Sequence, residues 1–314
     1  MMRVLVTGGH GYIGGRFVRA TSGAGALQII SAGRRQKPVP ANVESVLIDW
    51  SNFECLAGLC RRVDAVVHLA ALNEAECEKN PQLAQQVNVS YTSDLLQAAI
   101  ENGVRRFVDV STSKVFGANP AGVLDEKTGP SPVNEYAKTH RQAEELILRA
   151  HAEGKIQGVV LRLSNAVGAP ISVDVDAWSL IGNDLCRQAA TSGRIVLKSS
   201  GLAWRNFIAM GDVTAALQHA LKMPEAAFND GLFHLGGAHS LRIKDFAQMI
   251  AARAKSVLDQ NVAVQCAAAA PGEDHPPLEW RIDRLMATGW RPRANLDDEI
   301  DGTLRLCLQC FSPA

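Results

Sequence analysis

The hydrophobic and polar positions in the first half of the chain alternate between two patterns. Short apolar runs rich in β-branched residues, typical of buried strands, are separated by longer stretches with apolar residues every three to four positions, typical of helices. The apolar runs cover residues 4–6, 27–31, 45–49, 65–69, 106–110 and 157–163, and helical stretches follow residue 15 and cover 81–102 and 135–152. This order predicts an α/β fold, a Rossmann-type doubly wound parallel sheet.

The pattern becomes less regular after about residue 166. Helices expected over 179–191, 211–222 and 244–258 are mixed with short strands and with frequent Gly, Pro and Trp. We therefore expect residues 1–165 to form a dinucleotide-binding Rossmann domain. Residues 166–314 are expected to form mainly a smaller α/β substrate-binding region, part of which can fold back onto the Rossmann domain.

A glycine-rich segment joins the first predicted strand to the first predicted helix. Gly8, Gly11 and Gly14 give the spacing G-x-x-G-x-x-G. Glycine lets the backbone approach a pyrophosphate closely, and the free N–H groups and dipole of the following helix face its charge. We expect a dinucleotide to bind here, with Tyr12 and Ile13 also in contact with it.

The end of the second predicted strand bears on the choice of cofactor. An acidic residue at that place binds the ribose 2′-hydroxyl of NAD, but the sequence has Ala32-Gly33 followed by Arg34 and Arg35. Two guanidinium groups suit a 2′-phosphate, which favours NADP; two solvated loop arginines, with NAD as cofactor, are the alternative. Asp49 and Trp50 follow the third strand and are expected to meet the adenine, unless they belong to a plain surface loop.

Composition narrows the function further. The 314 residues include 32 Lys plus Arg and 32 Asp plus Glu, so net charge gives no basis for binding nucleic acid or a membrane surface. The first strand begins next to Met1, which leaves no room for a signal peptide, and no apolar run reaches the length of a membrane span. The seven cysteines are scattered, and the single pair Cys307 and Cys310 is not expected to bind metal. These features favour a reduced, cytoplasmic protein.

Motifs along the whole chain resemble those of the extended short-chain dehydrogenase/reductases. This family includes nucleotide-sugar epimerases, 4,6-dehydratases and 4-keto reductases. Beyond the glycine segment, the resemblance is carried by Val67-His-Leu-Ala-Ala71, Asn88-Val89, Val110-Ser-Thr-Ser-Lys-Val-Phe-Gly117, Tyr136-Ala-Lys-Thr-His140, Leu163-Ser-Asn-Ala-Val-Gly168, Trp204-Arg-Asn-Phe-Ile208 and Thr288-Gly-Trp-Arg-Pro292.

The resemblance implies a catalytic tyrosine, a Ser or Thr that shares its substrate oxygen, and a lysine four residues after the tyrosine. Tyr136 and Thr112 occupy the first two places, but His140 stands where the lysine is expected. A nearby ammonium would stabilise the phenolate by up to about 4 kcal/mol at an effective dielectric of 20. Histidine, with a reference pKa of about 6.5, is mostly neutral at pH 7. Two readings remain: an active enzyme with a weaker base, and a non-catalytic or weakly active cofactor-binding protein.

The resemblance also narrows the reaction. The 4,6-dehydratases follow the Thr with Asp-Glu, whereas this chain has Ser113 and Lys114, so dehydration is disfavoured. Reduction of a 4-keto sugar with NADPH and 4-epimerisation with a retained cofactor both stay open for a nucleotide-sugar substrate. A reductase of a non-nucleotide substrate is a further alternative, because Ala270 stands before Pro271-Gly272 where the family often has an arginine.

The resemblance alone implies a homodimer through residues 81–102 and 135–152. It also assigns the remaining site residues. Cofactor contacts are expected from Leu69, Ala70, Ala71, Asn88, Tyr136 and His140, and substrate contacts from Asn165, Asn183, Arg205 and, in place of the missing arginine, Arg281.

Overall fold

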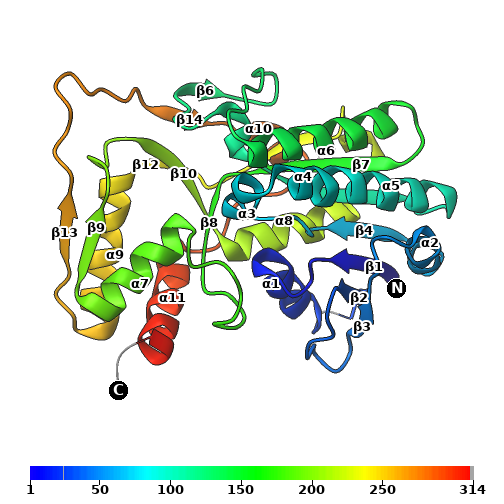
Figure 1. The fold of residues 1–314 in the computed structure, drawn as a ribbon, viewed down its shortest axis with the longest axis horizontal. Coiled ribbons are helices and arrows are strands. Elements are labelled where there is room, and N and C mark those ends of the chain that lie inside the picture. Colours follow the sequence, from blue (N-terminus) through cyan, green and yellow to red (C-terminus); the bar gives the residue numbers. More distant parts are fainter. Residues whose placement is uncertain (24, 312–314) are drawn as a thin grey trace.

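The computed structural model describes residues 1–23 and 25–311. A seven-stranded parallel sheet forms the core of its larger part, at the right in Figure 1. Its strand order is β11-β7-β5-β4-β1-β2-β3, so the order reverses between β1 and β4. This doubly wound α/β architecture confirms the predicted fold class. The strands are β1 (Met2–Thr7), β2 (Leu27–Gly33), β3 (Glu44–Leu47), β4 (Ala65–His68), β5 (Arg106–Thr112), β7 (Gln157–Leu163) and β11 (Leu232–Leu235).

Helices cover both faces of this sheet because successive strand residues point to opposite sides. Val4 and Val6 pack in one core with Phe17 of α1, whereas Leu5 packs in the other with Ile147 of α6. The first core is covered by α1 (Tyr12–Thr21) and α8 (Met210–Lys222), and the second by α2 (Phe53–Cys60), α5 (Tyr91–Glu101) and α6 (Glu135–Ala152).

The helix expected over 81–102 is interrupted. It consists of α4 (Pro81–Ala84), the π-helical segment η1 (Gln85–Ser90) and α5. A π-helical turn is a local irregularity often found at functional sites. Here it contains Asn88, whose contacts are described below.

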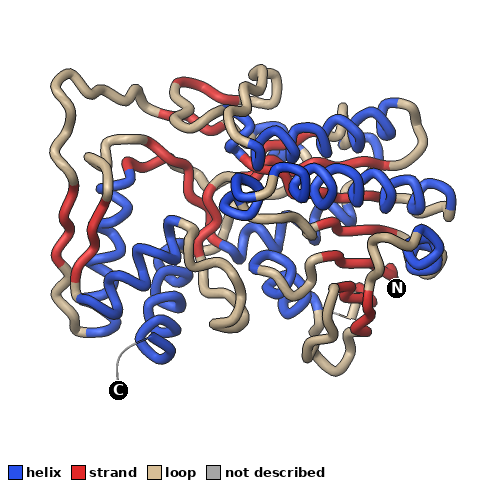
Figure 2. The backbone as a smooth tube through the Cα atoms, in the orientation of Figure 1, coloured by secondary structure: helices blue, strands red, loops and turns tan. Residues whose placement is uncertain are grey.

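The region after residue 166 contributes to both halves of the molecule. A separate core is enclosed by α7 (Ile181–Ser192), α9 (Ile243–Leu258) and α11 (Leu296–Phe311), with the paired strands β9 (Arg194–Leu197) and β13 (Ala263–Cys266), at the left in Figure 2. In contrast, α8 packs against the Rossmann sheet, and β11 is one of its strands. The strands β8 (Asn165–Val167), β10 (Trp204–Ala209) and β12 (Ser240–Arg242) form a small mixed sheet.

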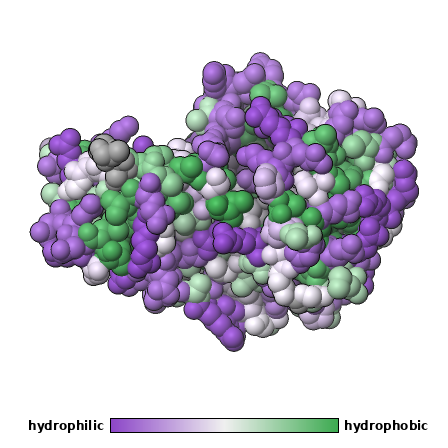
Figure 3. All heavy atoms as spheres, turned by 90° about the horizontal axis from the view of Figure 1, so that it is seen from below, coloured by the Kyte–Doolittle hydropathy of each residue, from purple (hydrophilic) through white to green (hydrophobic). Residues whose placement is uncertain are grey.

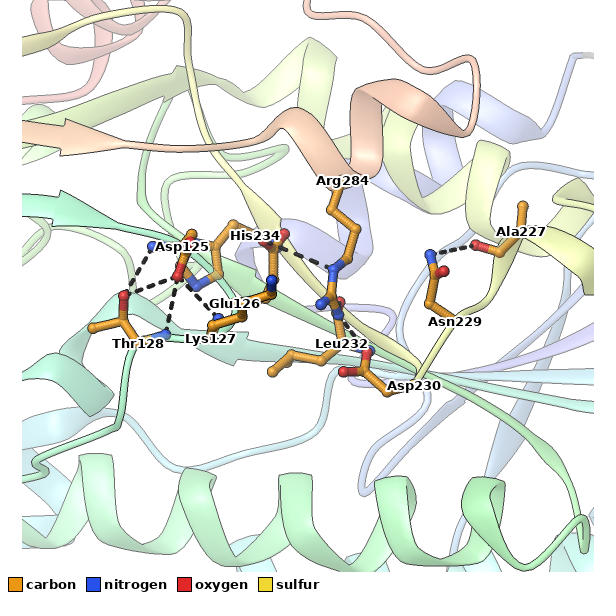
Figure 4. A network of polar contacts seen from close by, with 10 residues as sticks. All are labelled: Asp125, Glu126, Lys127, Thr128, Ala227, Asn229, Asp230, Leu232, His234 and Arg284. Atoms are coloured by element: carbon orange, nitrogen blue, oxygen red, sulfur yellow. Dashed lines mark hydrogen bonds and ion pairs between the residues drawn. The ribbon is translucent and has the colours of Figure 1, made fainter.

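Side chains from two distant segments of the chain, represented by Glu126 and Arg284, cover the edge strand β11. The backbone N–H of His234 donates to Glu126 at 2.8 Å, and Arg284 of α10 (Asp283–Ala287) lies between Glu126 and Asp230 (Figure 4). Covering an edge strand in this way prevents it from pairing with another chain. The adjacent elements are η3 (Glu225–Ala227) and the paired strands β6 (Gly122–Leu124) and β14 (Leu278–Trp280); η2 (Ser113–Phe116) and α3 (Glu74–Lys79) lie nearer the site.

On the face in Figure 3, apolar side chains form small groups among hydrophilic ones. Within residues 1–23 and 25–311, no helix has the length and apolar character needed to cross a membrane. The same residues contain no group of three or more His, Cys, Asp or Glu side chains arranged to hold a metal ion.

Candidate active site

The glycine segment forms a tight loop between β1 and α1, at the point where the strand order reverses. Gly8 has φ +68°, and a Cβ there would lie 2.6 Å from the carbonyl carbon of Leu69. A Cβ on Gly14 would lie 2.2 Å from the carbonyl oxygen of Gly8, and the N–H of Gly11 donates to that oxygen at 2.8 Å. Only glycine allows this packing. Helix α1 has no side-chain cap and no acidic residue in its first turn, so its N-terminus suits an anion.

Tyr12 joins this loop to the smaller region. Its hydroxyl donates to the carbonyl of Gly168 at 2.8 Å and to Asn183 at 3.4 Å. Asn183 is fully buried and donates in turn to the carbonyl of Ala177 at 3.1 Å. The two side chains therefore connect α1 to α7, and their expected contacts with cofactor and substrate stay predictions.

The end of β2 presents cationic groups. Arg34 and Arg35 are exposed, and neither has a hydrogen bond or an ion pair with any described residue. The imidazole of His10 fills the space beside Gly33, where a Cβ would lie 3.0 Å from the ring. Burial, and secondarily the charge of Lys37, lowers the pKa of His10. Neither guanidinium group is therefore paired with a described residue.

Asp49 and Trp50 differ in their surroundings. Asp49 is exposed, and hydrogen bonds from the hydroxyl and backbone N–H of Ser51 lower the pKa of its carboxyl. Trp50 is half-buried and stacks on Tyr91, with ring centroids 5.4 Å apart. Asp49 thus keeps a charged, accessible side chain, whereas Trp50 is fixed by packing.

Asn88 connects the loop after β4 to helix α6. Its side-chain oxygen accepts from the N–H of Leu72 at 2.8 Å, and its amide donates to Thr139 at 3.0 Å. The preceding residues of that loop, Leu69 and Ala70, pack against Gly8. The π-helical turn therefore fixes the position of the predicted cofactor-binding segment 69–71 relative to α6.

Tyr136 and Thr112 meet where β5 ends and α6 begins. Thr112 is the last residue of β5, and Tyr136 lies in the first turn of α6, whose N-cap Asn134 accepts from the N–H of Ala137 at 2.9 Å. Burial raises the pKa of Tyr136 to about 12, and the polar contact with the Thr112 hydroxyl opposes that rise. The phenol is therefore protonated at neutral pH.

His140 lies one helical turn after Tyr136, on the same face. The two ring centroids are 4.5 Å apart at an interplanar angle of 65°. Burial lowers the pKa of His140 to about 4, so the ring is neutral at pH 7. Its Nε2 atom is buried without a hydrogen-bond partner in the described chain.

Lys114 also lies close to the tyrosine. From the sequence, this residue was expected only to distinguish the chain from the 4,6-dehydratases. Its ammonium lies 5.9 Å from the centroid of the Tyr136 ring and pairs with Glu74. Glu74 also accepts from Asn134 at 2.6 Å. In the sequence, the only indication that Lys114 lies near the site is its position two residues after Thr112.

A buried ion pair lies below these residues and was not predicted. Arg162 of β7 donates to both carboxylate oxygens of Glu144, at 2.9 and 2.7 Å. The side chains are 1% and 0% exposed. Glu144 also accepts from Ser111 at 2.6 Å and from Arg141 at 3.0 Å. The sequence does show that Glu144 lies eight residues after Tyr136, and therefore on the same face of the helix.

Two of the predicted substrate residues, Asn165 and Arg205, lie on neighbouring strands of one small sheet, and Arg281 directly follows β14. Asn165 of β8 donates to the carbonyl of Asn206 in the neighbouring strand β10 at 2.9 Å. Arg205 donates to the carbonyl of Ala118 at 2.8 Å and to other groups of the chain. Arg281 is exposed and pairs with Glu279 at 2.8 Å. Asn165 and Arg205 are thus held by the chain itself, and Arg281 lies on the surface.

A dinucleotide fits these residues. A Cβ would fill the loop at Gly8 and Gly14, and the unpaired nitrogen of His140 is a free polar group beside the tyrosine. The glycine cradle lies at the switch in strand order, and the Tyr–Thr pair lies at the end of β5, on the same edge of the parallel sheet. This arrangement is typical of a Rossmann-fold dinucleotide-binding protein with an oxidoreductase-type site.

Comparison with known proteins specifies the family. Residues 4–236 match the model of the NAD dependent epimerase/dehydratase family, and the chain belongs to this family. It is 28% identical to a UDP-glucose 4-epimerase of Azospirillum brasilense over 98% of this chain and 91% of the relative. It is 29% identical to a dTDP-6-deoxy-L-talose 4-dehydrogenase (NAD(P)(+)) of Kitasatospora kifunensis over 95% of this chain and 93% of the relative.

A solved structure supports the fold. The UDP-glucuronic acid 4-epimerase from Bacillus cereus, in complex with UDP-glucuronic acid and NAD, superimposes with a TM-score of 0.80 at 22% identity, covering 99% of this chain and 100% of that one. At this identity the similarity shows the shared fold.

Proposed function

We propose that this protein is an NADP(H)-dependent reductase that acts on a keto group, at C4, of a nucleotide sugar. The observation that carries the proposal is the pairing of Tyr136 with Thr112 at the end of β5, on the same edge of the sheet as the glycine loop. The name of the Kitasatospora relative, a 4-dehydrogenase that uses NAD(P)(+), supports a redox reaction at this carbon.

The protonation state of Tyr136 suits reduction. With a pKa of about 12, the phenol holds its proton at neutral pH and donates it to the oxygen of the carbonyl group. Thr112 hydrogen-bonds the same oxygen and orients it. A nicotinamide cofactor, when bound, would supply the hydride. His140 orients Tyr136 and the cofactor ribose, and the glycine loop holds the pyrophosphate.

The free arginines support NADP(H) over NAD(H). Arg34 and Arg35 follow β2 with no ion pair among the described residues, and no carboxylate ends that strand. A 2′-phosphate would receive charge-assisted hydrogen bonds from both guanidinium groups. A reductase consumes NADPH in each turnover and releases NADP, so a preference for NADP(H) agrees with reduction.

A 4-epimerase is the second candidate. It is favoured by the similarity to a UDP-glucose 4-epimerase over 98% of this chain. Dehydration stays disfavoured, since Ser113 and Lys114 occupy the two positions expected to hold acids. A non-catalytic cofactor-binding protein is the alternative suggested by the neutral His140.

The test begins with the nucleotide that accompanies the purified protein. Denaturation and chromatography identify it, and empty protein is titrated with NADPH and NADH before assays with UDP- and dTDP-linked 4-keto sugars and hexoses. We expect empty protein, tighter binding of NADPH, and oxidation of NADPH by a 4-keto sugar. Retained NAD with interconversion of two hexoses would establish the epimerase instead. Binding of neither cofactor would contradict both.

We also propose that the protein works as a homodimer in the cytoplasm. Leu83 of α4 and Val133, just before α6, are 40% and 65% exposed, near the two helices expected at the interface. All seven cysteines are free thiols, as a reducing compartment would keep them. Light scattering of wild type and Leu83→Glu tests the dimer; a monomeric wild type would contradict it.

A further inference from the structure

The ammonium group of Lys114 lies over the ring of Tyr136. It is 5.9 Å from the ring centroid, a separation at which a cation is attracted to an aromatic face. Lys114 belongs to η2, which begins directly after Thr112. The hydroxyl oxygen of Thr112 accepts from the backbone N–H of Lys114 at 3.2 Å. The residue paired with Tyr136 at the end of β5 therefore also fixes the backbone from which Lys114 reaches the tyrosine.

The carboxylate of Glu74 holds Lys114 in this position. The two oxygens of Glu74 have different partners: Oε2 pairs with Lys114, and Oε1 accepts from the side-chain amide of Asn134 at 2.6 Å. Asn134 is the N-cap of α6, two residues before Tyr136. Glu74 therefore keeps a hydrogen bond to the start of α6 when its ion pair with Lys114 is broken.

The ion pair of Lys114 and Glu74 is half-exposed and can rearrange. The two side chains are 45% and 42% exposed, and water weakens an ion pair at such a place. A lysine ammonium carries three donors on a flexible four-carbon stem, so it can turn to a new acceptor nearby. A negative charge that forms on Tyr136 is such an acceptor.

The other charged and titratable groups around Tyr136 do not supply a free cation. On its own helix, His140 is neutral at pH 7, and Lys138 and Arg141 are paired with carboxylates of that helix. The groups that act on the phenol from α3 and β5 are Glu74, Cys77, Asp109 and Thr112, and none of these carries a positive charge. Among these described residues, the positive charge beside the ring therefore comes from Lys114.

We propose that Lys114 supplies the positive charge that is absent at position 140, and that its ammonium stabilises the phenolate which Tyr136 forms during the reaction. The inference rests on the proposed function. When Tyr136 donates its proton, the O–H bond of the phenol breaks and an O–H bond forms at the carbonyl oxygen of the substrate. Lys114 then turns from Glu74 to the phenolate and keeps all its protons, and the reverse reaction returns it to the carboxylate.

The resting protein agrees with this sequence of events. Burial and, among the charged groups, Glu74 raise the pKa of Tyr136, so the phenol keeps its proton while Lys114 is bound to the carboxylate. Removing the charge of Glu74 should therefore release the ammonium toward the hydroxyl of Tyr136.

Carbon NMR of the tyrosine rings tests this contact without turnover. The full-length protein has three tyrosines, is labelled with ¹³C at their Cζ atoms and is titrated from about pH 8 to 11; Tyr136→Phe identifies the signal of Tyr136. Glu74→Gln keeps an acceptor for Asn134 but releases Lys114. We expect Tyr136 to ionise at least about 1 pH unit lower in Glu74→Gln than in Glu74→Gln/Lys114→Gln.

The matched control for this titration is Glu74→Gln/Lys127→Gln, which removes an exposed lysine elsewhere and should behave like Glu74→Gln. Equal ionisation of Tyr136 in Glu74→Gln and Glu74→Gln/Lys114→Gln would overturn the proposal. Because this comparison does not depend on activity, it decides whether Lys114 acts on Tyr136 even in a protein without the proposed reductase activity.

The pH dependence of turnover then tests whether the charge serves the reaction. We expect Lys114→Gln to lower kcat for reduction about three- to tenfold with unchanged NADPH binding. The pH profile of the oxidation direction should move to higher pH in Lys114→Gln and to lower pH in Glu74→Gln, whereas Lys127→Gln should leave it unchanged. A merely structural ion pair would slow both variants without these opposite shifts, and that result would overturn the proposal.

Discussion

At the scale of single residues, the reactivity of Tyr136 depends on which neighbours carry charge. The cation nearest its ring among the described residues, Lys114, is paired with Glu74, and His140 is neutral. The pKa of about 12 therefore leaves Tyr136 a proton donor and a poor base.

Replacing His140 with Lys should shift the pH dependence of the oxidation direction. An ammonium beside the phenolate lowers the pKa of Tyr136, by roughly 1–3 units at an effective dielectric of 20, so kcat should reach its plateau at lower pH. Lys138→His on the exposed side of α6 is the control and should leave the profile unchanged. An unshifted profile in His140→Lys would count against the assigned role of position 140.

Replacing Tyr136 with Phe should lower turnover by about 10²–10⁴-fold, the typical contribution of a positioned acid. Cofactor binding, measured by the quenching of protein fluorescence on NADPH addition, should be unchanged, because the hydroxyl is removed but the ring stays in its apolar contacts with Leu72 and Cys77. A normal rate in Tyr136→Phe would remove Tyr136 from the reaction.

At the scale of elements, the β1–α1 loop depends on contacts between backbones. Gly14→Ala places a Cβ 2.2 Å from the Gly8 oxygen, which forces the loop apart. We expect affinity for NADPH to fall at least about tenfold, or about 1.4 kcal/mol of binding free energy. Gly129→Ala has no atom within 4 Å of the new Cβ and serves as the control. Equal affinity of both variants would show that the loop does not hold the cofactor.

The contact between α6 and β7 depends on the buried pair of Glu144 and Arg162. Glu144→Gln leaves a buried guanidinium without its counter-charge and should lower the free energy of unfolding by about 3–5 kcal/mol. Glu135→Gln removes an exposed partner of Lys138 on the same helix and should change it by less than about 1 kcal/mol. Urea unfolding measures both, and equal changes would show that burial of the pair is not what stabilises this contact.

At the scale of the whole molecule, stability should depend on pH through buried groups that stay neutral. Burial lowers the pKa of His68 and His234 to about 3 and of His140 to about 4. The unfolded chain binds these protons below a pH of about 6.5, so stability is lost as the pH falls through that value. Asp109 acts in the opposite direction: its pKa of about 8 means that stability falls as the pH rises from about 4 to 8.

Thermal unfolding from pH 5 to 8 tests this balance. We expect wild type to have its highest Tm near a pH of about 7, and Asp109→Asn to gain relative to wild type with each step toward pH 8. A constant Tm difference between the two proteins would show that Asp109 ionises normally in the folded state.

The sequence by itself determined the elements and the class of fold. Apolar runs such as 4–6 and 65–69 are typical of buried strands, and the glycines at 8, 11 and 14 indicate a close backbone contact. Both properties are local, so the sequence can show them. The family followed from the order of motifs, and the match over residues 4–236 confirmed it.

Only the tertiary structure decided which distant side chains meet. Glu144 pairs with Arg162, and the hydroxyl of Tyr12 bonds to the carbonyl of Gly168. From beyond residue 200, α8 packs on the Rossmann sheet and β11 joins it as a strand. The pKa values of Tyr136 and His140 also belong to this level. They are set mainly by burial, which depends on the packing of α6 against the sheet and leaves no local trace in the sequence.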